Sequence, residues 1–478
     1  MKKFPYIFQN RGQKETAFPA LNDGINSRPG RAMIYASVFL VFFAYFLSLY
    51  LPGLAESFSE DESQWVLASQ VYFSKILNIK FKEPECFETY PFFEKYYPKL
   101  AVWLMASSLY LGGELGSQSR AFCWDWEKTF SENNLAGTVP GFRTLFFGRL
   151  FMPFLAALGS VAFLIFMSRQ LSLVPAMLSS IFLGRHWLVE RSASAARLDI
   201  AAFSFGMFLL AFIICINWRK VSRGARSGQV AAFAAAGLML GLSASTKQNY
   251  FALLVVWVLF MLWVIFSDLE SEKALRKAGQ IRMLLTSSLA LMVAAFVFLG
   301  VNSLFAPDPS VTYHKIRRLF KVAVLVYGYK GSFSESLYTP FEKIESINFF
   351  VATAPFRTFL PGKINYNAER LLYENDPYYL ALKYLLLFLF LLGFFIMAAR
   401  MRTAYAVFKN TKSEKSEEMD RLVLAALVVV LVFISNFIWL PLAWDRYYIP
   451  ILLSFSILLG FALDFIFSSI KKKFQARP

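Results

Sequence analysis

Long apolar runs constrain the fold of this chain more than any other feature of its sequence. About 11 of them approach the roughly 20 helical residues that a bilayer crossing needs. They cover residues 32–51, 99–113, 150–167, 171–183, 200–216, 230–244, 250–266, 284–305, 379–397, 422–440 and 448–467. Hydrophobic residues make up 57% of the 478 positions, which is too apolar for one soluble core. The sequence therefore predicts an all-α polytopic membrane protein.

Positive charge marks one side of the predicted bundle. The formal net charge is +17, and the lysines and arginines gather before the first run, in short loops and in the tail. These clusters lie at 2–31, 219–226, 273–277, 400–412 and 471–473. Because cytoplasmic loops carry such an excess, both termini are predicted to be cytoplasmic, in a bacterial inner membrane. This placement argues against the nucleic-acid partner that the net charge alone would suggest.

The segments between the runs define the predicted organisation. Residues 1–31 form a cytoplasmic tail, 32–470 the transmembrane domain and 471–478 a basic cytoplasmic tail. The first run is too long for the core of a signal peptide, and no small-residue cleavage site follows it, which is typical of a retained signal anchor. Two polar segments, 52–98 and 306–378, are predicted to be exoplasmic loops with amphipathic helices.

The first exoplasmic loop contains a predicted amphipathic helix after Ser59. Its apolar stripe, which includes Trp65 and Val66, is expected to lie on the bilayer surface. Counting crossings puts every polar motif described below on the exoplasmic side only if segment 99–113 does not cross fully. That segment is short enough for a re-entrant or interfacial helix. The polar insert 114–140 would then be exoplasmic as well, with no role that the sequence predicts.

An acidic pair, Asp61–Glu62, follows the first run. A carboxylate at the membrane boundary is suited to remove a proton from an acceptor. Ser59 and Glu62 also fit a capping box, in which a hydroxyl and a carboxylate satisfy the first backbone amides of a helix. The two roles are compatible, because a capping Glu62 would hold Asp61 rigidly at the start of the helix.

Cationic groups, a carboxylate and aromatic residues recur at the other exoplasmic helix ends. Lys95 and Lys99 flank Pro98 at the start of the second run, where they are suited to bind a phosphate or to snorkel to the interface. The remaining members of this set, further along the chain, are Asp199, Lys247, Arg446 and Tyr447. Each of these residues alone is explained equally well by a helix-end ion pair or by the aromatic belt of a membrane protein.

The order of these motifs resembles the membrane glycosyltransferases of the GT-C superfamily, in particular the family of protein O-mannosyltransferases and lipid A aminoarabinose transferases. The matching motifs are Asp61–Glu62, Tyr97-Pro98-Lys99-Leu100, Arg197 with Asp199, Gly237 and Gly241 with Thr246-Lys247, and Arg446-Tyr447 with Pro450. Lys99 stands where the family has a second proline, so the phosphate-binding lysine stays open between Lys95 and Lys99.

The resemblance implies a GT-C-like bundle and an inverting transferase. Such an enzyme moves a monosaccharide from a polyprenyl-phosphate donor to an exoplasmic glycolipid, polysaccharide or protein. The catalytic residues it implies are Asp61, Glu62 and Asp199, and the donor-phosphate contacts are Lys95, Lys99, Lys247, Arg446 and Tyr447. These residue types suit such a reaction. Cations at head-group depth stabilise the departing phosphate, and a carboxylate base removes the proton of the acceptor.

Two further functions remain open at this point, a secondary transporter and a non-catalytic membrane scaffold. A transporter would place ionisable groups near the midplane, often in paired repeats. Lys383 and Asp464 are among the few charges inside an apolar run, and no inverted pair of halves stands out.

No cofactor is predicted beyond the lipid-linked sugar donor, and the sequence gives no support for a divalent metal. The three cysteines lack metal-site spacing, and His186 and His314 lie far apart. Cys86 and Cys123 would share one oxidising compartment in this topology, so a disulfide between them stays open.

Overall fold

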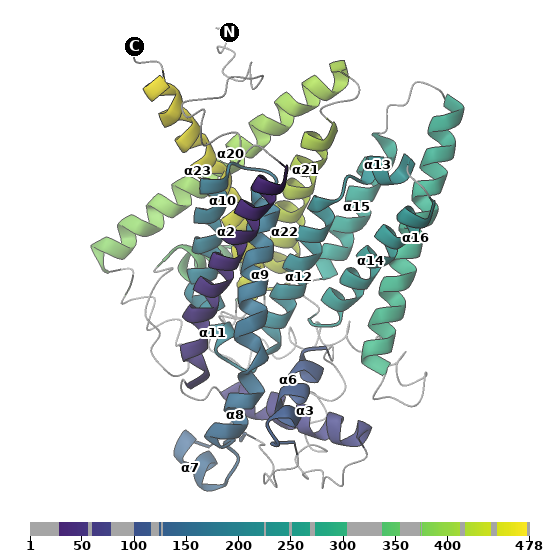
Figure 1. Ribbon diagram of the computed structural model, residues 1–478. Helices are drawn as coiled ribbons and strands as arrows, with labels where there is room; N and C mark the ends of the chain where they lie inside the picture. The colour runs from purple at the N-terminus through teal and green to yellow at the C-terminus, as the bar shows by residue number, and fades with distance from the viewer. Residues whose placement is uncertain are drawn as a thin grey trace.

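The computed structural model of the chain is a bundle of helices (Figure 1). It describes residues 28–55, 60–77, 100–115, 124–125, 128–223, 226–247, 251–267, 273–303, 337–353, 373, 375–411, 416–440 and 447–475. No strand occurs in these ranges, and they contain 8 helical stretches long and apolar enough to cross a membrane. Three shorter apolar helices bring the set to the about 11 runs of the sequence. The predicted all-α polytopic fold is confirmed.

The long stretches are formed by single helices or by pairs of consecutive ones. They contain α2 (Arg28–Tyr50), α8 (Phe142–Arg149) with α9 (Phe151–Ser168), α12 (Leu198–Cys215), α14 (Arg226–Ala244), α16 (Lys273–Ser303), α20 (Pro377–Thr411), α21 (Ser416–Leu427) with α22 (Phe433–Trp439), and α23 (Ile449–Gln475). A π-helical turn, η5 (Val428–Val432), joins α21 to α22. The helix α23 extends through the basic residues of the tail, because lysines are good helix formers and favour a helix C-terminus.

The three shorter apolar helices are α6 (Leu100–Leu111), α10 (Leu173–Arg185) and α15 (Ala252–Phe266). The 12 residues of α6 rise about 18 Å, well short of a hydrocarbon core of about 30 Å. This length agrees with the expectation that segment 99–113 does not cross fully.

Small elements gather at the two ends of the bundle. The elements η1 (Leu51–Ala55), α3 (Glu60–Ile76), α7 (Phe130–Leu135), α11 (Trp187–Ala193), α13 (Trp218–Arg223), α18 (Pro340–Ile347) and the π-helical turn η4 (Asn348–Ala352) complete the set used below. Figure 1 shows α3, α6, α7 and α8 together at one end, which we name the site end. At the opposite, distal end lie α13, the start of α2 and the end of α23 (Figure 1).

The helix predicted after Ser59 exists as α3, but its apolar face has a different partner from the one expected. Trp65 and Val66 are buried inside the protein. Because α6 and α8 pack against α3 and cover this face, it does not lie on the bilayer surface at these positions. The second predicted amphipathic stretch, within 306–378, lies outside the described residues.

Two glycines allow α14 and α16 to approach closely. A Cβ at Gly237 would lie 2.4 Å from the carbonyl oxygen of Ala290, and one at Gly241 would lie 2.8 Å from that of Ala294. Their spacing of four residues puts both on one face of α14. This contact fixes the end of α14, from which the chain continues directly to Lys247.

Candidate functional site

Glu62 lies in the first turn of α3 and is fully buried. Arg149, the last residue of α8, donates from Nε and Nη2 to the two oxygens of Glu62 at 2.7 and 2.6 Å. The backbone N–H of Ala196 donates to Oε1 of the same carboxylate at 2.7 Å, and Arg149 also reaches the carbonyl of Leu54 at 3.3 Å. Glu62 therefore fastens α3 to α8 and to the turn before α12 through a bidentate, charge-assisted pair.

Sequence reasoning assigned Glu62 to a capping box or to catalysis and missed Arg149. The cap depends on Ser59, which lies outside the described residues. A signal for Arg149 was present, since it is the one charged residue of the apolar stretch 144–168. A buried arginine needs a partner, but nothing local in the sequence points to a carboxylate 87 residues away.

A second cluster joins three of the residues predicted from the sequence. The ammonium of Lys247 donates to Oδ1 of Asp199 and lies 5.4 Å from the centroid of the Tyr447 ring. Asp199 belongs to the first turn of α12, and both charged side chains are buried. The helix start and the two loop segments thus form a cation site with one carboxylate and one aromatic wall.

These two clusters belong to one region of the molecule. Ala196, which binds Glu62, lies in the turn that leads directly into Asp199. The N–H of Leu100, the first residue of α6, donates to the carbonyl of Ser245 at 3.0 Å, so α6 begins beside the segment that carries Lys247.

The described part of the chain therefore brings together Glu62, Asp199, Lys247 and Tyr447. The backbone of Asp61 belongs to the first turn of α3, directly before Glu62. The other predicted site residues, Lys95, Lys99 and Arg446, lie outside the described residues.

Among the residues that the structure describes, no group of three or more His, Cys, Asp or Glu is able to hold a metal. Cys86, Cys123 and His314 lie outside this part of the chain, and the free thiol of Cys215 is exposed.

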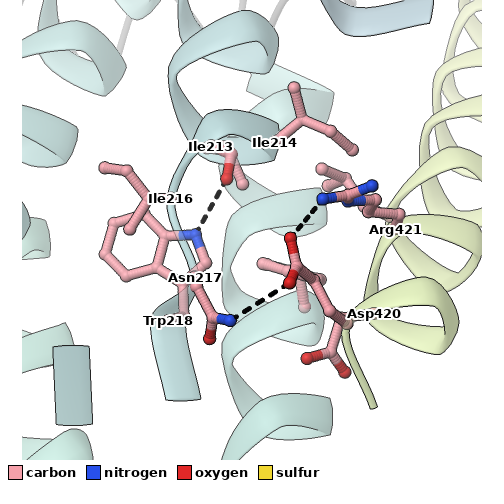
Figure 2. A pocket seen from close by; sticks show the side chains of 10 residues that line it. Ile213, Ile214, Ile216, Asn217, Trp218, Asp420 and Arg421 are labelled. Carbon is pink, nitrogen blue, oxygen red and sulfur yellow. Dashed lines mark hydrogen bonds and ion pairs between the residues drawn. The ribbon is translucent and has the colours of Figure 1, made fainter. Parts of the chain in front are cut away.

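A pocket at the distal end has no connection with these clusters. Figure 2 shows it between the end of α12, α13 and α21, with Asn217, Trp218 and Arg421 among its lining residues. Asn217 donates to Glu417 at 3.3 Å, and Trp218 donates to the carbonyl of Ile213 at 3.0 Å. No residue of the predicted site lines this pocket, so it is not part of the candidate site.

Comparison with known proteins gives likenesses of fold. No protein-family model matches the chain, and no curated protein matches its sequence. Its fold is similar to the oligosaccharyltransferase AglB of Archaeoglobus fulgidus, solved with an inhibitory peptide and a dolichol-phosphate, at 11% identity and a TM-score of 0.47. It is also similar to ArnT of Cupriavidus metallidurans, solved with undecaprenyl phosphate, at 12% identity and a TM-score of 0.41.

Each likeness covers 92% of this chain, but the chain spans only 51% of that AglB chain and 61% of ArnT. A structure of the Archaeoglobus fulgidus oligosaccharyltransferase without ligands gives 12% identity and a TM-score of 0.47, with 92% and 52% covered. Both proteins are GT-C membrane glycosyltransferases, the class that the motif order resembles. All of these TM-scores lie below 0.5, so the likeness concerns the fold and does not extend to function.

Proposed function

We propose that this chain is an inverting glycosyltransferase that moves a monosaccharide from a polyprenyl-phosphate donor to an exoplasmic acceptor. The observation that carries the proposal is the meeting of four segments, far apart in the sequence, at one end of a membrane bundle. They are the start of α3, the turn before α12, the segment after α14 and the start of α23. Together they supply carboxylates and cations beside an apolar bundle, which a lipid-phosphate donor requires.

Lys247 is the proposed centre of the donor-phosphate site. A phosphate monoester or diester would compete with Asp199 for its ammonium, which would also stabilise the charge of the departing phosphate. The N-termini of α12 and α23 open toward the same cluster, and their dipoles favour an anion there. Lys95, Lys99 and Arg446 are the further cations of the proposal. The contact of Leu100 with Ser245 supports this role for Lys99, its neighbour in the chain.

Asp61 is the proposed general base, and Glu62 is the residue that holds it. A base must be kept within hydrogen-bond reach of the proton it removes. The bidentate pair of Glu62 with Arg149 fixes the first turn of α3, to which Asp61 belongs. Asp199 is bound to Lys247, so its proposed role is to orient that ammonium.

The proposed orientation follows from charge. The distal end carries Arg219 and the basic end of α23, which suit the cytoplasmic side. The site end would then face the exoplasm, where the acceptor would be a glycolipid, a polysaccharide or a protein. A bacterial inner membrane is the proposed location.

A specific observation disfavours the transporter alternative. Transport requires ionisable groups along a path near the midplane. Asp464, a main candidate for such a group, accepts from the backbone N–H of Ser172 at 3.1 Å and is also bound by Arg400. Ser172 is the N-cap of α10 at the distal end, so Asp464 closes a helix terminus.

The decisive experiment offers the purified protein, in nanodiscs, a panel of polyprenyl-phosphate sugars and exoplasmic acceptors. We expect transfer of one sugar with inversion at its anomeric carbon, and weaker binding of polyprenyl phosphate by Lys247→Met. Arg219→Met, which removes a buried cation from the distal end, is the matched control and should bind the lipid normally. Transfer with retention, or no binding of polyprenyl phosphate by the wild-type protein, would contradict the proposal.

A further inference from the structure

A buried stack of three aromatic rings joins three elements near the cation site. Phe350 of η4 stacks on Tyr448, with ring centroids 4.2 Å apart and ring planes at 18°. It also stacks on Trp187 of α11, with ring centroids 5.8 Å apart and ring planes at 29°. All three side chains are buried. The ring of Phe350 is therefore held between α11 and the residue that precedes α23.

The backbone around Phe350 is fixed independently of its ring. Nδ1 of His186 accepts from the N–H of Leu188 at 3.3 Å, so the proton lies on Nε2, which donates to the carbonyl of Val351 at 3.2 Å. On the preceding helix α18, the ammonium of Lys343 donates to two terminal carbonyls of α22 at 3.1 and 3.0 Å. The element η4 is thus anchored on both sides, and Phe350 projects from a rigid base.

Tyr448 connects this stack to the cation site. Its carbonyl accepts the N–H of Leu452 at 2.8 Å, so its position sets the first turn of α23. The residue before it, Tyr447, supplies the ring that lies 5.4 Å from the ammonium of Lys247. Tyr448 therefore packs against Phe350, while the adjacent Tyr447 lies against the ammonium of Lys247. Because the two tyrosines are neighbours in the chain, a shift of Tyr448 moves Tyr447 as well.

We infer that Phe350 is a positioning residue for the donor-phosphate site, which it serves by holding Tyr447 against Lys247 through Tyr448. Without the ring of Phe350, the start of α23 loses its support and the aromatic wall leaves the ammonium. The polyprenyl-phosphate head group then meets a less ordered cation. This inference deepens the proposed function and rests on it.

The test compares two neighbouring phenylalanines. Phe350→Leu removes the ring that stacks on Tyr448, whereas Phe349→Leu removes an equally buried ring that contacts Phe350 edge-on at 5.1 Å and Tyr373 at 6.4 Å. We expect Phe350→Leu to raise the Kd for polyprenyl phosphate and the KM for the donor about 3- to 10-fold, the range of one cation–π contact. The kcat should stay near that of the wild type, and Phe349→Leu should change neither constant.

A double-mutant cycle separates positioning from general loss of packing. If Phe350 acts through Tyr447, then Phe350→Leu should add nothing to the effect of Tyr447→Leu on donor binding. Additive effects, or equal effects of Phe349→Leu and Phe350→Leu, would overturn the inference. Should Phe350→Leu not fold, Tyr448→Leu breaks the same stack from the side of α23, and Tyr448→Phe keeps the ring and should restore binding.

The failures of the two proposals are distinguishable. A wild-type protein that does not bind polyprenyl phosphate refutes the proposed function. Normal binding by the wild type, combined with an unchanged Kd in Phe350→Leu, refutes only the positioning role of Phe350.

Discussion

Both ends of the bundle carry an ion pair that joins distant segments of the chain, but the two pairs differ in chemistry. At the distal end Arg219 donates to both oxygens of Asp420, each at 2.7 Å. Asp420 also accepts from Trp263 at 2.9 Å, and Arg219 donates to the hydroxyl of Ser267 at 2.6 Å. At the site end the ammonium of Lys247 meets Asp199 and the face of Tyr447. A planar guanidinium in a complete network holds helices together, whereas a compact ammonium exchanges partners more easily.

The Glu62–Arg149 pair shows that side-chain chemistry, and not location alone, makes this difference. It lies at the site end, yet it has the bidentate geometry of the distal pair and is buried more deeply. We therefore expect arginine pairs to govern stability at both ends, and the lysine cluster to govern donor binding.

The largest effect is expected at Asp61. Asp61→Asn keeps the shape of the side chain and removes the proton acceptor, so transfer should fall by roughly 10²–10⁴, the usual contribution of a positioned base. Donor binding and the melting temperature should be retained. Measuring the transfer rate, the Kd and the melting temperature of this variant checks the assignment. A fully active Asp61→Asn protein would redirect the search for the base to Asp199.

A variant of the adjacent residue, Glu62→Gln, tests the buried pair of Glu62 with Arg149. From the sequence alone a mild effect is expected, because glutamine also serves at the third position of a capping box. The pair with Arg149 changes this expectation, since the variant leaves a buried guanidinium without its carboxylate. We expect the free energy of unfolding to fall by about 3–5 kcal/mol. Chemical denaturation measures it, and the rate per folded molecule should change less than in Asp61→Asn.

Lys247→Met and Arg219→Met should differ in which property they change, the transfer rate or the stability. Losing a charge-assisted contact to the donor should slow transfer by Lys247→Met roughly 10- to 150-fold. Arg219→Met should lower the free energy of unfolding by about 3–5 kcal/mol and keep its activity per folded molecule. Parallel assays of rate and unfolding check both statements.

A double variant makes this comparison sharper. Asp199→Asn/Lys247→Met removes both buried charges, so it should be more stable than Lys247→Met alone. Its transfer rate should stay low, because the phosphate still lacks its cation. Recovery of transfer together with stability would show that the pair is structural, like the one at the distal end.

Much of the fold can be predicted from the sequence, because the length of an apolar run is a local property of the chain. The runs predicted the helices, and the shortness of segment 99–113 anticipated α6. What covers the apolar face of α3 cannot be predicted in this way. Periodicity indicates that Trp65 and Val66 share a face, but it does not say whether lipid or protein covers that face.

The sequence predicts site residues only where they belong to the ordered motifs that resemble GT-C glycosyltransferases. Asp199, Lys247 and Tyr447 were predicted and meet in the structure. The arginine pairs were missed, because Arg149 and Glu62 are 87 residues apart and Arg219 and Asp420 are 201 apart. Pairing over such distances along the chain depends on how the helices cross, and no periodic pattern in the sequence indicates it.

The helix α14 runs from α13 at the distal end to the segment that carries Lys247, and a smaller perturbation tests whether it couples the two ends. Gly237→Ala would place a Cβ 2.4 Å from the carbonyl oxygen of Ala290, so α16 must move away. We expect a loss of about 1–3 kcal/mol in the free energy of unfolding, together with weaker donor binding, since α14 leads into Lys247. Gly228→Ala on the same helix meets nothing within 4 Å and should be neutral or stabilising. Unfolding curves of the two variants check the difference.

The smallest effect is expected at an exposed cap, where a carboxylate fixes a helix start without burial. Glu132 accepts from the hydroxyl and the N–H of Thr129, both at 2.7 Å, at the start of α7. The side-chain hydrogen bond from Thr129, followed by the backbone one, lowers the pKa of Glu132 below its usual value. A lowered pKa in the folded state means that the cap contributes stability above the pKa of the unfolded chain. That contribution is lost as the pH falls through the folded value.

Hydrogen-exchange protection factors in the first turn of α7 measure this loss, which should be confined to α7. Glu132→Gln is the control, because glutamine keeps the capping geometry and does not titrate. Protection in this variant should not depend on pH over the same acidic window. If it falls as in the wild type, the carboxylate of Glu132 is not the source. The contrast with Glu62 is then complete: Glu132 acts at its capping box through local hydrogen bonds, whereas Glu62, at the capping box predicted from the sequence, pairs with a distant arginine.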